Sequence, residues 1–288
     1  MRDARFALMV TVPVALFLIA WVVYPIGYSF WLSVHSFKIR GGQVGPFFAG
    51  FDNYIQALSD PDVQNAFVNT VQLDLEGIFL TTGLALGIAL VLNEVIPGGS
   101  FLKVLALLPW AVSDFGTGVV WKWIWIGGFG FMNGVLIRLG LATGSTNLIT
   151  TDTAIHFVAI ADAWHLAPLG AFFILASLSV IPQDLYNQAK IDGAGALTRF
   201  RRVTLPLINY SLLITLVIAT LFISTTLDEV LTLTGGGPGD SSQTLTYQIY
   251  LQTFVLFKLG YGAAISYLTL GYIIIFATIW FLLLMRRH

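Results

Sequence analysis

The 288-residue chain has no cysteine and few charged residues. Without thiols it can form no disulfide, no cysteine-ligated zinc site and no thiolate nucleophile. Charged residues make up 10% of the sequence, against roughly 25% in ordinary soluble domains. A soluble core cannot absorb the 57% of residues that are hydrophobic. The composition therefore predicts an all-α polytopic membrane protein, and we expect residues 1–288 to form a single transmembrane domain.

Several catalytic motifs are also missing. The sequence has no His-Glu-x-x-His, so a membrane zinc protease is unsupported. Gly-Pro-Gly-Asp at 237–240 superficially resembles a motif of intramembrane aspartyl proteases, but Asp240 falls in a polar loop rather than in an apolar run. The same loop lacks the Gly-Lys-Ser/Thr of a phosphate-binding loop, so the chain cannot hydrolyse ATP by that route. We expect no enzyme activity, no metal site and no nucleic-acid partner.

Six apolar segments are long enough to cross a bilayer, which takes about 20 residues. They cover residues 8–34, 69–93, 103–126, 154–180, 207–231 and 263–285. The first segment is too long for a signal peptide and no small-x-small cleavage site follows it, so we expect a retained helix. Between the first two segments, residues 51–67 predict a short amphipathic helix that is interrupted near Asp60-Pro61. Residues 235–242, Gly-Gly-Gly-Pro-Gly-Asp-Ser-Ser, predict a cluster of turns.

The basic residues predict the orientation, because Lys and Arg are enriched in cytoplasmic loops. With the N-terminus inside, nine of the 14 Lys and Arg residues lie inside and five outside. The inner set is Arg2, Arg5, Lys103, Lys190, Arg199, Arg201, Arg202, Arg286 and Arg287, and the outer set is Lys38, Arg40, Lys122, Arg138 and Lys258. Both termini are therefore predicted to be cytoplasmic, as is the loop between the fourth and fifth segments.

That loop, about 182–206, predicts a helix–turn–helix elbow. Pro182 favours a helix start before QDLYNQAKI, and Gly193 can adopt the left-handed backbone that ends a helix. A second short helix, LTRFRRV, then leads to Pro206, which suits the first turn of the next helix. An ordinary positive-inside loop would explain the arginines, but it would not explain the spacing.

The spacing resembles the signature of ABC importer permeases, Glu-Ala-Ala, three residues, Gly, nine residues, Ile-x-Leu-Pro. Here Asn187-Gln188-Ala189 is followed after three residues by Gly193, and after nine more by Val203-Thr204-Leu205-Pro206. The Glu and the first Ala of the signature are absent. LLPWAVS (107–113), ADAWHLAPL (161–169), LSVIPQDLYNQAKIDGA (178–194) and LTGGGPGDSSQTLTYQIY (233–250) look like the carbohydrate branch, in particular its maltose-type first permease subunit.

The resemblance implies a set of partners. In the family the elbow docks in a cleft of an ATPase subunit, which binds ATP and magnesium, so this chain would hold no cofactor itself. Two ATPase subunits, a second permease subunit that completes a heterodimer, and an extracytoplasmic solute-binding protein would assemble with it in a bacterial or archaeal plasma membrane. The predicted ATPase-coupling residues are Tyr186, Asn187, Gln188, Ala189, Asp192, Gly193, Ala194, Arg199, Phe200, Leu205 and Pro206.

Polar residues inside apolar segments are costly and are candidates for a transport path. Asp114 follows Trp110 by four residues, Asp162 precedes His165 by three, and Phe222 precedes Thr226 by four, so we expect each pair to share one face of a helix. A carboxylate beside an aromatic face suits a sugar, because C–H groups stack on rings and hydroxyls donate to acids. The resemblance implies these positions as substrate-binding residues: Trp110, Asp114, Asp162, His165, Leu166, Leu169, Phe222 and Thr226.

Structural roles remain open for each of these residues. Asp114, Asp162 and His165 can simply hold helices together, and Trp110 can be a packing residue. For Asp74 and Glu76 we expect the favourable position of acids near a helix N-terminus. Asp228 and Glu229 we expect to contact a loop or a binding protein rather than substrate.

The sequence thus predicts a permease subunit of an ATP-driven carbohydrate importer, with a neutral oligosaccharide such as a disaccharide as substrate. Glycerol 3-phosphate and an amino sugar are the alternatives, and the acidic residues disfavour the phosphate. A secondary transporter would typically show repeated halves, and an intramembrane enzyme would need paired catalytic groups at one depth.

Overall fold

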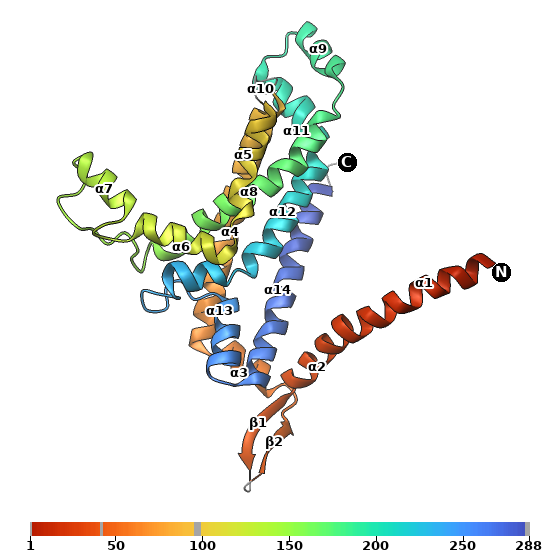
Figure 1. Cartoon of the computed structure of the whole chain (residues 1–288), viewed down its shortest axis with the longest axis vertical. Coiled ribbons are helices and arrows are strands. Elements are labelled where there is room, and N and C mark those ends of the chain that lie inside the picture. Colours follow the sequence, from red (N-terminus) through yellow and green to blue (C-terminus); the bar gives the residue numbers. More distant parts are fainter. Residues whose placement is uncertain (1, 41–42, 95–98, 286–288) are drawn as a thin grey trace. The chain divides into compact units, whose positions relative to one another are not determined.

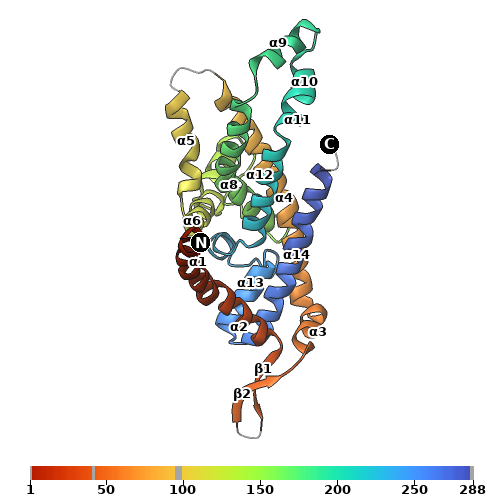
Figure 2. The ribbon, with the colours of Figure 1, turned by 90° about the vertical axis from the view of Figure 1, so that its right-hand side faces the viewer.

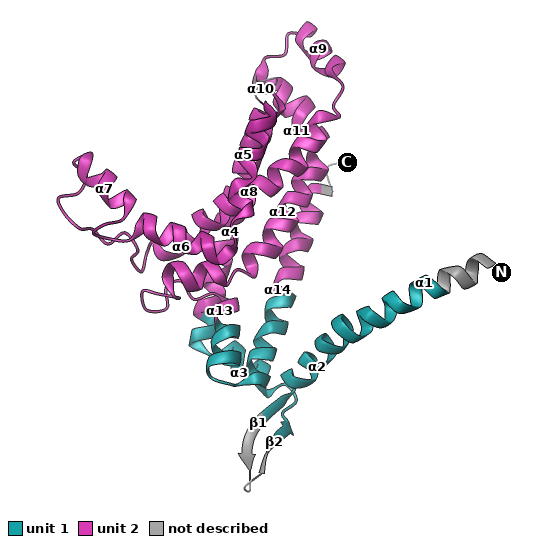
Figure 3. Ribbon diagram, viewed as in Figure 1, with its two compact units in different colours: residues 1–64, 248–271 teal, residues 65–247, 272–288 magenta. Residues whose placement is uncertain are grey.

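The computed structural model describes residues 2–40, 43–94 and 99–285 (Figure 1). Arg286 and Arg287, which contributed to the predicted orientation, lie outside the described residues. The described residues form two compact units (Figure 3). Unit 1 comprises residues 1–64 and 248–271, and unit 2 comprises residues 65–247 and 272–288.

The chain is built almost wholly of helices. In sequence order they are α1 (Arg2–Leu18), a π-helical turn (Ile19–Val23), α2 (Tyr24–Ser33), α3 (Asp52–Ser59), α4 (Pro61–Asn93), α5 (Gly99–Ala111), α6 (Asp114–Trp125), α7 (Phe131–Arg138), α8 (Ala154–Ser179), α9 (Gln183–Ile191), α10 (Ala196–Arg199), a π-helical turn (Phe200–Thr204), α11 (Leu205–Leu207), α12 (Asn209–Ser224), a π-helical turn (Val230–Thr234), α13 (Leu245–Tyr250), a π-helical turn (Leu251–Val255) and α14 (Leu259–Met285). Strands β1 (His35–Arg40) and β2 (Gln43–Phe48) form an antiparallel hairpin in which His35 pairs with Phe48 and Arg40 with Gln43.

Among the described residues, four helices are long and apolar enough to span a membrane, and six do so if each of two bent pairs counts as one span. The bent pairs are α5 with α6, at 92°, and residues 196–207 with α12, at 69°. A multi-pass, mostly helical membrane protein is therefore confirmed. The third predicted segment is not one straight helix, and the fifth ends at Ser224 rather than at 231.

In unit 1, side chains of α3 and of the residue that follows it hold neighbouring segments together. Asn53 donates from Nδ2 to the carbonyls of Ser33 (2.8 Å) and His35 (3.0 Å), which fixes α3 to the end of α2. The predicted interruption at Asp60-Pro61 is confirmed, because α3 ends at Ser59 and α4 begins at Pro61. Asp60 also accepts from the Tyr261 hydroxyl at 2.7 Å.

In unit 2, the core lies where α4, α8 and α12 meet (Figure 2). Leu73, Val158 and Ile223 are almost fully buried there, one from each helix. At Gly170 of α8, an added Cβ would lie 2.6 Å from a Thr215 methyl and 3.0 Å from the Ala85 methyl. Only glycine permits so close an approach of three helices.

The turn cluster at 235–242 is confirmed and is fastened to α4. Gly235, Gly236 and Gly239 have positive φ angles of 66°, 84° and 63°. Asn69 of α4 donates to the carbonyls of Asp240 (3.1 Å) and Gln243 (3.0 Å). These hydrogen bonds therefore hold the loop against α4.

Candidate functional site

A cavity of about 380 Å³ lies where two interrupted helices meet α8 in unit 2. Its walls come from the first turn of α6, from α8, and from the end of α12 together with the segment that follows it. The lining residues are Asp114, Asp162, His165, Leu166, Phe222, Thr225, Thr226, Leu227, Asp228 and Glu229.

The first interruption separates α5 from α6. Helix α5 contains Pro109 and ends at Ala111, and the chain turns before Ser113 caps α6. The Ser113 hydroxyl accepts from the Gly116 amide at 3.2 Å, as an N-cap side chain does. Asp114 is the first residue of the new helix, and its side chain is 55% exposed. An acid at this position is also favoured by the helix dipole.

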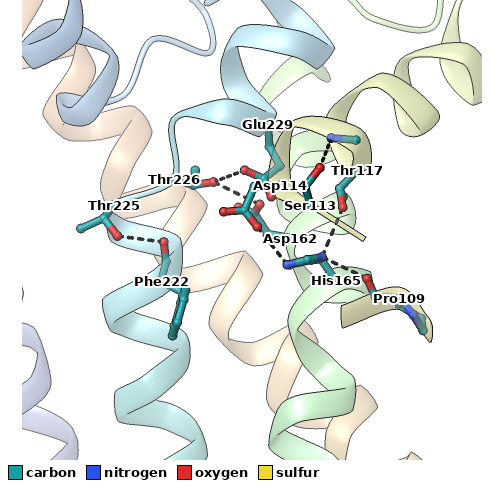
Figure 4. Close-up of polar contacts among 11 residues, drawn as sticks. Pro109, Ser113, Asp114, Thr117, Asp162, His165, Phe222, Thr225, Thr226 and Glu229 are labelled. Atoms are coloured by element: carbon teal, nitrogen blue, oxygen red, sulfur yellow. Dashed lines mark hydrogen bonds and ion pairs between the residues drawn. The ribbon is translucent and has the colours of Figure 1, made fainter. Parts of the chain in front are cut away.

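His165 of α8 joins both sides of this interruption (Figure 4). Its Nδ1 lies 3.1 Å from the Pro109 carbonyl of α5 and 3.2 Å from the Thr117 hydroxyl of α6. The Pro109 carbonyl accepts a hydrogen bond when Nδ1 carries the hydrogen, and the Thr117 hydroxyl can either donate or accept. The other ring nitrogen, Nε2, lies 3.0 Å from Asp114 Oδ1. His165 therefore contacts α5 and α6 through one ring nitrogen and the Asp114 carboxyl group through the other.

The second interruption follows Ser224, the last residue of α12. The Ser224 hydroxyl donates to Asp74 Oδ2 of α4 at 2.7 Å, and the Tyr272 hydroxyl of α14 donates to the same oxygen at 2.6 Å. Asp74 is fully buried. Asp74 therefore links the end of α12 to both α4 and α14. This differs from the expected role at a helix N-terminus, because α4 begins at Pro61, thirteen residues earlier.

Beyond this interruption, Thr226 connects two buried acids. Its hydroxyl lies 2.8 Å from Glu229 Oε2 and 3.3 Å from Asp162 Oδ1. Asp162 and Glu229 are only 2% and 3% exposed, and Asp162 Oδ2 has no hydrogen-bond partner among the described residues. Figure 4 shows the carboxyl groups of Asp114, Asp162 and Glu229 pointing toward one another.

The two interrupted helices also pack directly on each other. An added Cβ on Gly118 of α6 would lie 1.8 Å from Thr232 Oγ1 and 3.0 Å from the Glu229 Cα. Glycine at 118 thus lets α6 approach the backbone of the segment that follows α12. At Gly118, the wall formed by α6 therefore touches the wall formed by the segment after α12.

Six of the eight predicted substrate-binding residues line the cavity: Asp114, Asp162, His165, Leu166, Phe222 and Thr226. Trp110 and Leu169 are not among the lining residues, although both lie in helices next to it. Substrate binding by any of the eight stays a prediction.

Two predicted pairings along one helix do not exist. Trp110 and Asp114 are separated by the bend between α5 and α6, and Phe222 and Thr226 by the end of α12. Asp162 and His165 do share one face of α8, and both reach the cavity.

Sequence reasoning missed Glu229 as a cavity residue. It is buried and lines the cavity with Asp228, whereas we expected both acids to contact a loop or a binding protein. The acid pair directly after a long apolar run was the available signal. Glu76, the other acid assigned to a helix start, lies 2.6 Å from Nδ1 of His156 in α8.

The elbow forms as the sequence predicts. Helix α9 begins after Pro182 and ends in a Schellman motif, with Gly193 N–H donating to the Lys190 carbonyl and Ala194 N–H to the Ala189 carbonyl. Gly193 has a φ of 78°, in the left-handed region. The second helix runs from Ala196 to Leu207 and bends at Ile208 into α12, so Pro206 lies before the bend and not, as predicted, in the first turn of the next membrane helix.

Within the elbow, the Tyr186 hydroxyl lies 3.1 Å from the Thr204 hydroxyl and joins its two arms. Phe200 and Arg199 line a cavity of about 540 Å³ with Tyr186. The other predicted coupling residues lie at the surface or partly so: Asn187, Gln188, Ala189, Asp192, Gly193, Ala194, Leu205 and Pro206. Contact with an ATPase remains a prediction for all of them.

Curated relatives resemble the chain over nearly its whole length. The trehalose/maltose transport system permease protein MalF of Thermococcus litoralis is 31% identical over 97% of this chain and 93% of its own. The sulfoquinovosyl glycerol transport system permease protein SmoG of Agrobacterium fabrum is 32% identical over 92% of this chain and 85% of its own. These relatives are named as transport permeases, which confirms the prediction of a transport subunit rather than an enzyme.

Solved structures share the fold. A chain of a bacterial ABC transporter involved in the import of the acidic polysaccharide alginate matches with a TM-score of 0.81 and 18% identity, over 99% of this chain and 96% of that one. The family described as "Binding-protein-dependent transport system inner membrane component" matches residues 81–287. These residues include both interrupted helices, the cavity and the elbow. The chain therefore belongs to the family of inner-membrane permease components of binding-protein-dependent transport systems.

Proposed function

We propose that this chain is one of two transmembrane subunits of an ATP-driven carbohydrate importer. The observation that carries the proposal is the cavity at the two helix interruptions, where polar side chains lie beside the exposed ring of Phe222. Transporters place substrate sites at such interrupted helices, because freed backbone groups and helix ends can face a ligand there. The trehalose/maltose name of one relative supports a sugar substrate.

We further propose that the chain crosses a bacterial or archaeal plasma membrane six times with both termini in the cytoplasm. Each bent pair then counts as one span. The distribution of Lys and Arg supports this orientation, which places the elbow on the cytoplasmic side and the Gly-rich loop outside.

The elbow is proposed to dock on one of two ATPase subunits, which bind ATP and magnesium. Apolar side chains on its surface support this role, since Ile191 and Leu197 are 86% and 61% exposed. Exposed apolar surface marks an interaction site where it forms a contiguous patch. ATP-driven movement of the elbow would be carried into α12 across the bend at Ile208, and the helices would rock between inward-open and outward-open states.

The proposed substrate is an oligosaccharide of disaccharide size that carries no negative charge. Four acids line the cavity with a single histidine, and none of these lining residues, all in the described part of the chain, is Lys or Arg. A phosphate such as glycerol 3-phosphate would meet like charges unless the second permease supplied cations. A neutral sugar is one candidate, and the acids favour an amino sugar as the second.

The test is to express this chain with its second permease, ATPase and solute-binding protein, and to measure ATP hydrolysis and uptake across a panel of sugars. We expect stimulation by at least one uncharged or amine-bearing oligosaccharide and none by glycerol 3-phosphate. Replacing Arg199, Arg201 and Arg202 with Glu should abolish co-purification of the ATPase. ATPase association and uptake that survive this change would refute the proposed docking.

A further inference from the structure

The cavity contains fewer hydrogen-bond donors than acceptors. Thr226 has one hydroxyl hydrogen, yet its oxygen lies within bonding distance of both Glu229 and Asp162. It can donate to only one of them at a time. Asp162 Oδ2 has no partner among the described residues, although the side chain is 98% buried and lines the cavity. A bound ligand is therefore expected to bring donors to this group of acids.

The charges of the cavity are also unbalanced. Asp162 and His165 face it from α8, Asp114 from α6, and Asp228 and Glu229 from the segment after α12. Helix α5 contributes the Pro109 carbonyl to His165, and Asp74 of α4 is already bonded to Ser224 and Tyr272. His165 is the only basic side chain that lines the cavity among the described residues, and it is engaged by Asp114. Buried acids without a positive partner are costly.

We propose that the group formed by Asp114, Asp162 and Glu229 binds a protonated amine of the transported sugar. An ammonium group supplies several N–H donors and one positive charge, which are the two things the cavity lacks. Charge-assisted hydrogen bonds are also stronger than those from a neutral hydroxyl. This inference rests on the proposed carbohydrate transport, and it narrows the substrate to an amine-bearing oligosaccharide.

The experiment compares two disaccharides with one skeleton, cellobiose and the β-1,4 disaccharide of glucosamine. Binding of each is measured directly on the assembled transporter in nanodiscs, without the solute-binding protein. We expect the amine-bearing sugar to bind about tenfold more tightly, since charge-assisted bonds exceed neutral ones. Raising the pH until the amine is neutral should remove this preference.

The variants Asp162→Asn and Glu229→Gln each remove one negative charge while nearly preserving the shape of the side chain. Either should reduce the preference to about twofold or less, since the charge-assisted bond is lost. Retained binding of cellobiose would show that the cavity is still folded. The matched control is Asp152→Asn, an exposed acid in the loop before α8, which should leave the preference unchanged.

Three outcomes would overturn the inference. The two sugars could bind equally well, or both variants could keep the full preference. Binding of both sugars could also rise equally as the pH falls, in which case a proton alone neutralises the acids. If neutral sugars drive transport but no amine preference exists, only this inference fails. If no carbohydrate binds or stimulates ATP hydrolysis, the proposed function fails.

Discussion

The cavity and the elbow are both interruptions of helices in unit 2, but different groups hold them in place. At the cavity the interruptions are buried and held by side chains: Asp74 on Ser224, His165 on Asp114, and Thr226 on two acids. At the elbow the interruption is exposed and held mainly by backbone hydrogen bonds around Gly193. A cavity held by side chains can change its chemistry by single substitutions, whereas the elbow depends on one backbone conformation.

The largest effect is expected from Gly118→Ala. The new methyl group would overlap Thr232 Oγ1 and press on the Glu229 backbone. We therefore expect the free energy of unfolding to fall by about 3 kcal/mol, as is typical of an overpacked contact. Thermal unfolding of the purified transporter measures it. Gly134→Ala in α7 is the control, because nothing lies within 4 Å of its added Cβ. The double variant with Thr232→Ala should recover part of the loss, and no recovery would mean that the contact is not the cause.

Asp74→Ala should have the next largest effect. It leaves the hydroxyls of Ser224 and Tyr272 without their acceptor, at a cost of about 2 kcal/mol for unsatisfied buried groups. Asp74→Asn keeps one oxygen acceptor and should cost less. Asp152→Ala, at an exposed acid, serves as the control in the same unfolding measurement. Equal stability of Asp74→Ala and the control would show that Asp74 does not hold the end of α12.

Gly193→Ala should weaken the elbow through its backbone alone. There is open space around the added Cβ, but the φ of 78° costs an L-residue about 1 kcal/mol. We expect reduced ATPase association in a pull-down, with a milder effect for Gly193→Asn, because Asn tolerates this conformation better. Gly195→Ala is the matched control, since it has equal space and a φ of −67°. If the two alanine variants behave alike, backbone conformation does not determine docking.

The smallest effect, a slight loss of ATPase affinity, is expected from Tyr186→Phe. This change removes one hydrogen bond between the two arms of the elbow. At a partly buried site such a bond contributes about 0.5 kcal/mol. Thr204→Val removes the same bond from the other side and should give a similar loss of ATPase affinity. If the double variant loses about as much as either single one, the bond is the shared cause. Losses that simply add would contradict it.

The elbow was predictable because its signals are local. Proline fixes φ at the start of a helix and glycine permits the left-handed end, so Pro182 and Gly193 give the two ends of α9 without any knowledge of packing. The long apolar helices were predictable for a similar reason, since length and composition alone mark them.

The interruptions at the cavity were not predictable from the same signals. Pro109 lies inside α5, and the bend comes only after Ala111, where Ser113 can cap a new helix. We expected the fifth segment to continue to residue 231, but it ends at Ser224, where Ser224 bonds to Asp74 of α4 and Thr226 to Asp162 of α8. The hairpin at 35–48 was also missed, although Gly-Gly between two short runs is a hairpin signal.

The glycine contact at position 170 has a consequence for leakage. A helix junction with no room for a methyl group has no room for a water molecule either. Water cannot form a continuous file between α4, α8 and α12 at that level, so protons and small ions have no route there. This three-helix contact therefore acts as a local seal against water at the level of Gly170.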